Sequence, residues 1–335
     1  MSSTFHHGGN SPSTRPTHHF SLWLLATALL LAIMPGSIGA QDAKKEDGEK
    51  PKLPAPQKHV LTTKDGVSLH CYFYPGTRKK ESIPIMVIHG WEERGSQYAK
   101  LALSLQQKGH AVILPDLRGH GFSIKRKTPQ GSKTIRRDRM TKLDMLSMVL
   151  DLEACKSFLK KQNNAGLLNL EQLCLVGSDL GALVALEWSV RDWNAPRLPS
   201  LKQGQDVKGL VLISPSQSFK GLSTQAALAH PVVRQLSMMI ISGKENTKVY
   251  SDTRRIYNRL EKFHPKPPKD QKERLAKQDL FLIGVESTRQ SADLLASSVK
   301  PNISSLIGNF VLYRLDKRKA EYPWTDRTNP FKESN

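Results

Sequence analysis

Asp179 is the residue of this chain best placed to do chemistry. It stands in the middle of the sequence Gly177-Ser178-Asp179-Leu180-Gly181. The apolar run before it, residues 173–176, reads as a buried strand, and the small apolar residues after it read as a helix. A sharp strand-to-helix turn presents its central residue, and glycines flank that residue because side chains do not fit there. The pattern therefore predicts that Asp179 lies at the tip of such a turn.

Three interpretations of this turn are open. A carboxylate such as Asp179 can attack carbon without a base, but the ester that it forms needs activated water to leave. Alternatively, Asp179 can cap the free N–H groups of the following helix, which is worth about 0.5–2 kcal/mol. In the third interpretation Ser178 is the nucleophile, although it stands one residue from the tip.

The elements that must position this turn alternate between strand and helix patterns along the chain. Most of the predicted strands are nearly all apolar, which is typical of a mainly parallel sheet covered by helices on both faces. The sequence therefore predicts an α/β protein. We expect strands at 59–63, 67–74, 83–88, 111–115, 173–176, 207–214, 238–242 and 280–284, and helices at 97–108, 143–161, 180–193, 249–263 and 292–319.

Three motifs in order carry a resemblance to a known family. They are His89–Tyr98 (HGWEERGSQY), Pro115–Gly121 (PDLRGHG) and the turn around Asp179. Together they resemble the α/β-hydrolase superfamily, most closely its monoacylglycerol lipase and serine aminopeptidase group. The resemblance covers about residues 59–315. It implies an α/β-hydrolase fold with a minimal lid, because only residues 215–237 are left for one.

The resemblance implies an oxyanion hole made by two backbone N–H groups, those of Trp91 and Leu180. It also places His89 and His120 in loops beside the site. We expect structural roles for both histidines, with His89 kept as a candidate base.

The acid of the family's catalytic triad is expected after the strand at 238–242. Asn246 stands at that position in this chain. Glu245 and Asp252 are the nearby carboxylates, and each is also compatible with an ordinary exposed charge.

The base of the triad is expected just after the strand at 280–284. The sequence there is VESTRQS, with Gln290 and no histidine, and the last histidine of the chain is His264. The nucleophile, the acid and the base therefore all depart from the serine-hydrolase pattern.

Two functional hypotheses follow. In the first, the chain is a secreted hydrolase-fold protein with a degenerate triad, and it acts as a binding protein or pseudoenzyme. In the second, it is an active hydrolase of an ester, amide or related bond that uses Asp179 with His89 and either Glu245 or Asp252. Families with an aspartate nucleophile, the haloalkane dehalogenases and epoxide hydrolases, carry tryptophan after that aspartate and a large cap. This chain has Leu180 and no room for a cap.

The N-terminal region predicts export. The apolar run at 20–34 has 15 residues, fewer than the about 20 that a membrane span needs, and it is followed by small residues up to Ala40. We expect cleavage after Ala40 and a periplasmic or extracellular protein, with an uncleaved membrane anchor as the alternative. The expected parts are a signal peptide at 1–40, a disordered tether at 41–58, a hydrolase-like domain at 59–320 and a tail at 321–335.

The formal net charge of +20 suggests an acidic partner. Residues 125–142 (KRKTPQGSKTIRRDRMTK) hold eight Lys and Arg and one acid. They read either as a solvated loop or as a surface for an acidic polymer or anionic surface, and the candidate contacts are Lys125, Arg126, Arg136 and Arg137. Few aromatic residues interrupt the charges, so we expect no specific nucleic-acid binding.

No zinc-like, P-loop or dinucleotide-binding pattern appears, so we expect no metal and no cofactor. The three cysteines are an odd number and do not suggest a disulfide framework. We expect Cys71 and Cys174 to be small buried apolar residues. Nothing in the sequence indicates an oligomeric state, a substrate or a named partner.

Overall fold

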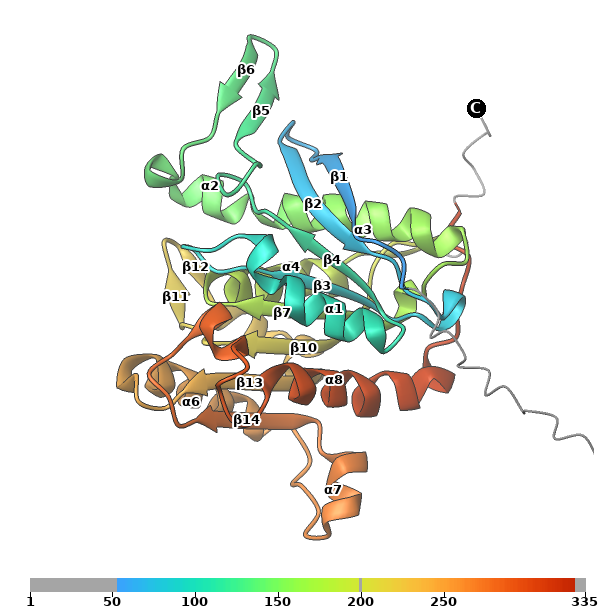
Figure 1. Cartoon of the computed structure of the whole chain (residues 1–335), viewed down its shortest axis with the longest axis vertical. Coiled ribbons are helices and arrows are strands. Elements are labelled where there is room, and N and C mark those ends of the chain that lie inside the picture. The colour runs from blue at the N-terminus through green and yellow to red at the C-terminus, as the bar shows by residue number, and fades with distance from the viewer. Residues whose placement is uncertain (1–52, 199–200, 329–335) are drawn as a thin grey trace, which may run out of the picture. The chain divides into compact units, whose positions relative to one another are not determined.

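A computed structural model describes residues 53–198 and 201–328. Within these residues the centre is an eight-stranded sheet, parallel except for its second strand, which runs antiparallel to both of its neighbours (Figure 1). This confirms the predicted α/β class and mainly parallel sheet. In order across the sheet the strands are β1 (Gln57–Thr62), β2 (Ser68–Tyr74), β4 (Ala111–Pro115), β3 (Pro84–Ile88), β7 (Leu173–Ser178), β10 (Val207–Ile213), β13 (Ser237–Gly243) and β14 (Leu280–Val285).

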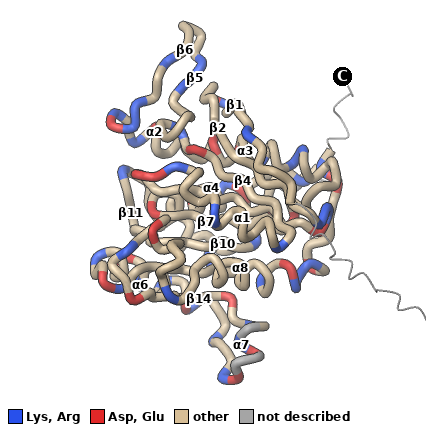
Figure 2. The backbone as a smooth tube through the Cα atoms, in the orientation of Figure 1, with Lys and Arg blue, Asp and Glu red and all other residues tan. Residues whose placement is uncertain are grey.

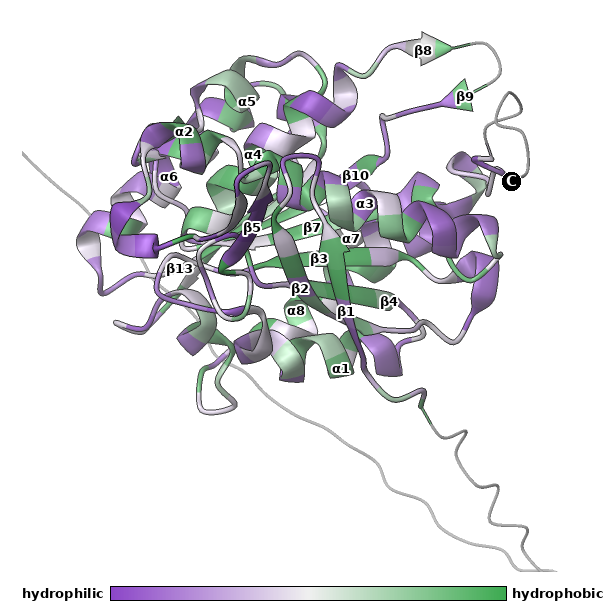
Figure 3. Ribbon diagram, turned by 90° about the horizontal axis from the view of Figure 1, so that it is seen from above, coloured by the Kyte–Doolittle hydropathy of each residue, from purple (hydrophilic) through white to green (hydrophobic). Residues whose placement is uncertain are grey.

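Helices cover both faces of the sheet, as the apolar strands require. The side chains of α3 (Val149–Asn164), α4 (Leu180–Trp193) and α6 (Thr247–Glu261) bury one face. Those of α1 (Ala99–Gln107) and α8 (Ile303–Arg314) bury the other. The central strands are accordingly hydrophobic throughout (Figure 3).

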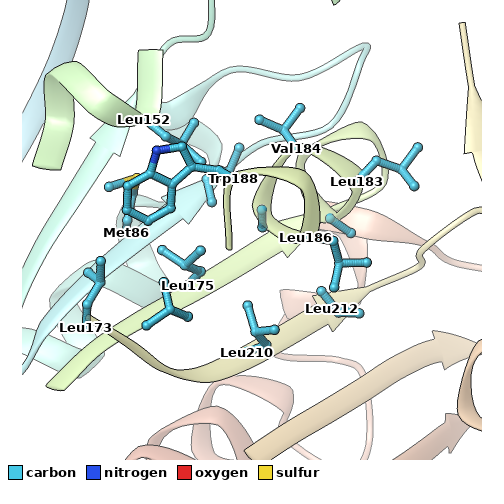
Figure 4. Packing of buried hydrophobic residues seen from close by; sticks show 14 of the residues in the cluster. Met86, Leu152, Leu173, Leu175, Leu183, Val184, Leu186, Trp188, Leu210 and Leu212 are labelled. Carbon is cyan, nitrogen blue, oxygen red and sulfur yellow. The ribbon is translucent and has the colours of Figure 1, made fainter. Parts of the chain in front are cut away.

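Helix α4 lies at the centre of one core, directly after the turn at Asp179. Leu183 and Leu186 of this helix belong to the same buried cluster as Leu175 and Leu212 of the strands beneath (Figure 4). Trp188 is fully buried in that cluster. The turn is therefore held between a packed strand and a packed helix.

Two predicted helices are wrong in extent. The one expected at 143–161 is two helices, α2 (Lys142–Leu146) and α3, because the chain turns at Ser147, whose hydroxyl donates to Leu143 O. The one expected at 292–319 is interrupted at Pro301. There Asn302 caps the start of α8 by accepting from Ser305 N–H, and short 3₁₀ segments flank the helix at 291–295 and 316–321.

The domain boundaries also differ from the expected ones. Strand β1 already begins at Gln57, and Pro54 O accepts from the side chain of Gln106. At the other end, Arg327 is buried in ion pairs with Glu171 and Asp206. The predicted signal peptide and most of the predicted tether lie outside the described residues.

Three hairpins outside the main sheet were not predicted. They are β5–β6 (Lys125–Thr128 and Gly131–Thr134), β8–β9 (Arg197–Leu198 and Leu201–Lys202) and β11–β12 (Ser218–Phe219 and Leu222–Ser223). The first occupies the basic run, and the third occupies the region where a lid would lie. Cys71, Cys155 and Cys174 are buried and free. Among the described helices none has the length and apolar character that a membrane span requires.

Candidate functional site

The turn at Asp179 has the predicted strand-turn-helix geometry. Asp179 follows β7 and precedes α4, with φ 48° and ψ −116°, a backbone conformation that non-glycine residues rarely adopt. Its N–H donates to Ile213 O at the end of β10 (2.9 Å). Ser178, in contrast, is fully buried beneath the tip, so the interpretation of Ser178 as an accessible nucleophile is wrong.

The side chain of Asp179 does not cap helix α4, so the capping interpretation is wrong as well. The carboxylate instead accepts from the N–H of Trp91, with Oδ2 3.1 Å from the nitrogen. Leu180 begins α4, where N–H groups lack intrahelical acceptors. The structure therefore brings Asp179, Trp91 and Leu180 together, and the chain's own anion is bound to one of the two predicted oxyanion-hole donors.

A second carboxylate, Glu93, lies beside Asp179, and the sequence analysis missed it. Glu93 Oε2 accepts from Gly90 N–H and Tyr98 Oη, both at 2.6 Å, and Oε1 accepts from Ala292 N–H at 2.9 Å. A Cβ atom built on Gly90 would lie 2.8 Å from Glu93 Oε2 and 3.2 Å from Asp179 Oδ2. The two carboxylates thus lie close together around Gly90. Burial and the charge of Glu93 raise the pKa of Tyr98 well above its usual value.

His89 is engaged on both ring nitrogens. Nδ1 donates to Gly90 O at 2.7 Å, and Nε2 accepts from Leu117 N–H at 3.0 Å. Burial, followed by the neighbouring His120, lowers the pKa of His89 to about 3. The ring is therefore neutral near pH 7 and has no free nitrogen with which to activate water.

His120 has a similar position in the loop behind the site. Its ring nitrogens lie 3.0 Å from Arg118 O and 2.8 Å from Trp91 O, and burial lowers its pKa. This histidine supports the backbone of the residue that donates to Asp179, in agreement with the expected structural role.

The two expected triad positions are occupied by side chains with other bonds. Asn246 caps α6 by accepting from Val249 N–H (3.2 Å). Gln290 accepts from Ser214 Oγ (2.7 Å) and donates to Gly243 O (3.0 Å), which ties the ends of β10 and β13 to the loop after β14.

The other candidate acids do not complete a triad either. Glu245 is exposed, and Asp252 accepts from the side chain of Gln217 at 2.9 Å. Among the described residues, no histidine side chain is hydrogen-bonded to Asp179, Glu245 or Asp252. The described chain also contains no cluster of three His, Cys, Asp or Glu side chains that could hold a metal ion.

A polar hollow of about 500 Å³ opens beside this site. Its lining combines carboxylates with guanidinium groups and the backbone of the 119–121 turn. The residues are Glu92, Glu93, Arg94, Gln97, Gly119, His120, Gly121 and Arg137.

Three of the four predicted anion contacts are already paired within the chain. Arg126 pairs with Asp65 (3.6 Å), Arg136 with Asp138 (2.8 Å) and Arg137 with Glu92 (2.8 Å). Lys125 is exposed and has no ion pair with any carboxylate that the structure describes. An anionic ligand at Arg126, Arg136 or Arg137 would therefore compete with a carboxylate of the chain, and the four-residue contact set stays a prediction.

Comparisons with known proteins agree with the fold. A family model described as "alpha/beta hydrolase fold" matches residues 83–248. An uncharacterized protein of Mycobacterium tuberculosis is 27% identical over 139 residues, 42% of this chain and 43% of that protein. A non-heme chloroperoxidase of Burkholderia pyrrocinia is 41% identical over 63 residues, 19% of this chain and 22% of that protein. The chain thus spans less than half the length of these relatives.

Solved structures with the same fold include two hydrolases. An esterase of Pyrococcus furiosus superposes with a TM-score of 0.54 at 16% identity, covering 78% of this chain and 91% of the esterase. A dienelactone hydrolase of Anabaena variabilis superposes with a TM-score of 0.52 at 15% identity, covering 78% and 99%. At such low identity the likeness shows the fold.

Proposed function

The chain belongs to the α/β-hydrolase superfamily, and from this premise we propose that it is a binding protein that keeps the hydrolase scaffold without triad catalysis. The bond from Trp91 N–H to the Asp179 carboxylate carries the proposal. An oxyanion hole works because its donors meet the charge that develops on the substrate. For an acyl substrate, the resident Asp179 carboxylate uses one donor and repels the charge on the substrate oxygen.

The acid and base positions support the same proposal. Asn246 and Gln290 cannot relay a proton, and both hold backbone in place. General-base catalysis contributes about 10²–10⁴-fold to a rate, and no described histidine is bonded to Asp179 to supply it. The polar hollow lined by Glu93 and Arg137 is the site where we place the ligand.

An active hydrolase with Asp179 as nucleophile is the second candidate. It is favoured by the φ of 48° at Asp179, because backbone strain of this kind is concentrated at functional sites. It requires a base for the water that releases the intermediate, and His89 does not meet that need. Glu93 is the carboxylate beside Asp179, but it already accepts three hydrogen bonds.

An activity assay on three proteins tests the proposal. We expect no multiple turnover of short or medium acyl esters by the wild type, and no labelling by a fluorophosphonate probe. Asp179→Ser is expected to gain neither ester turnover nor probe labelling, because Gln290 and Asn246 still supply no base or acid. Asp179→Asn is expected to melt within about 2 °C of the wild type, since its amide oxygen can accept from Trp91 N–H.

Asp138→Asn, at an exposed carboxylate away from the turn, is the matched control. The proposal fails if the wild type turns over steadily, Asp138→Asn does so too, and Asp179→Asn does not while its melting temperature is unchanged. Glu93→Gln would then be the next variant to assay for loss of the base.

Export is a second proposal, and it rests on residues 20–40 alone. We expect protein isolated from its native host to begin at Gln41 and to be recovered outside the cytoplasm. Intact-mass measurement checks this. A full-length species that is extracted only with detergent would instead support the uncleaved anchor.

A further inference from the structure

The segment 122–146 projects beyond the sheet and carries unpaired positive charge. It contains the β5–β6 hairpin, a 3₁₀ turn at 137–139 and helix α2, which lie together at one end of the described body (Figures 1 and 2). We call it the basic projection. Five of its cations are exposed and form no ion pair with a described carboxylate; they are Lys125, Lys127, Lys133, Arg139 and Lys142.

The basic projection also exposes large apolar side chains. Leu143 is 73% and Leu146 is 36% exposed, and their spacing of three residues places them on one face of α2. At the base of β5, Phe122 is 64% and Ile124 is 36% exposed. Four of the nine large apolar side chains exposed among the described residues thus fall within these 25 residues. A single exposed leucine needs no explanation, but exposed apolar groups gathered among unpaired cations do.

We propose that the basic projection docks on the surface of an anionic phospholipid membrane. The lysines would lie against the lipid phosphates, and Leu143 and Leu146 would enter the interfacial region. A soluble polyanion explains the charges but gives the leucines nothing to contact. A single-stranded nucleic acid would also be expected to use several stacking aromatic side chains, and Phe122 is the one aromatic residue of the projection. The proposal does not depend on the chemistry at Asp179.

A single reporter on α2 tests the docking. The three native cysteines are buried, so Leu143→Cys in the full chain gives one accessible thiol among the described residues for a polarity-sensitive dye. The matched reporter is Lys269→Cys, at an exposed position in the segment between α6 and β14. We expect the dye at 143 to shift to the blue on vesicles of equal phosphatidylcholine and phosphatidylglycerol, and not on phosphatidylcholine alone. The dye at 269 should not shift on either, which separates docking from any anchoring by residues 20–34.

Charge reversal identifies the surface. We expect a triple variant labelled at 143 to bind anionic vesicles about a hundredfold more weakly than the protein without the charge reversals, near fivefold for each lysine. The three substitutions are Lys125→Glu, Lys127→Glu and Lys133→Glu, and the affinity is read from the lipid concentration that gives half of the blue shift. The control variant reverses Lys248, Lys266 and Lys269, which are exposed and have no described ion pair. Its affinity for anionic vesicles should fall only a few-fold. Far-UV circular dichroism confirms that both triple variants fold.

Three outcomes would overturn the proposal. One is a dye at 143 that does not respond to anionic vesicles. Another is an equal loss in both triple variants, which would mean diffuse charge attraction. The third is a dye at 143 that responds to heparin or duplex DNA and not to vesicles, which would assign the projection to a soluble polyanion.

Discussion

Gly181→Ala is expected to unfold the domain or to lower its melting temperature by about 10 °C or more. A Cβ atom on Gly181 would lie 2.2 Å from Ile88 O and 2.6 Å from His89 O. Both oxygens belong to buried backbone at the end of β3, so neither can move aside like the end of a flexible side chain. Overpacking of this kind costs about 3 kcal/mol or more, and in a domain of this size each kcal/mol shifts the melting temperature by about 2–4 °C.

Gly308→Ala in helix α8 is the matched control. A Cβ atom there would meet the side-chain end of Lys108, at 2.7 Å from Cε, and that end can swing away. Alanine favours a helix over glycine by about 1 kcal/mol, so Gly308→Ala should be neutral or stabilising. Thermal melts of the two variants measure the difference. A stabilising Gly181→Ala would contradict the observed packing, in which α4 passes too close to β3 for a Cβ atom at position 181.

The fold could be predicted because its signals are local. Apolar strand runs and the glycines at 177 and 181 stand within a few residues of the elements that they define. The expected reason for the glycines, that side chains do not fit beside the turn, holds at Gly177, where a Cβ atom would lie 2.5 Å from Gly181 O within the same turn. The turn places its positive φ on Asp179, and Gly181 is needed because the helix passes close to a neighbouring strand. That strand is 93 residues earlier in the chain, so turn chemistry alone did not show it.

The site was less predictable because its bonds join distant segments. The acceptor role of Asp179 depends on the loop at Trp91, and Glu93 reaches Ala292 across 199 residues. The pairing of Arg126 with Asp65 is likewise invisible within the basic run. The sequence suggested a helix cap at Asp179 and anion contacts at Arg126 and Arg137, but contacts with distant segments engage all three side chains. The pair of glutamates after Trp91 was the one available sign that the loop carries carboxylates.

Arg118 shows how the second motif supports the first. Its guanidinium bonds to Asp151 (2.8 and 3.0 Å) and to Asp65 (2.7 and 3.0 Å), and its own N–H donates to Asp151 (2.9 Å). The side chains of Arg118 and Asp151 are almost completely buried. The turn that Arg118 fixes also supplies Leu117 N–H to His89 and the ring of His120 to Trp91 O. Arg118 is therefore a positioning residue for the loop that donates to Asp179.

Arg118→Met is expected to cost about 3–5 kcal/mol of unfolding free energy at pH 7, because it leaves the Asp151 carboxylate buried without its partner. Burial already raises the pKa of Asp151 in the wild type, against the opposing effect of Arg118. Without Arg118 the folded-state pKa rises further above that of the unfolded chain, so the folded variant takes up a proton first as the pH falls. Its deficit should therefore shrink between pH 7 and pH 4. Urea unfolding across that range measures the deficit.

Arg136→Met, at a solvent-exposed ion pair, is the control, and its unfolding free energy should show no measurable change at any pH. A pH-independent deficit in Arg118→Met would mean that packing alone, and not the buried charge of Asp151, makes Arg118 necessary.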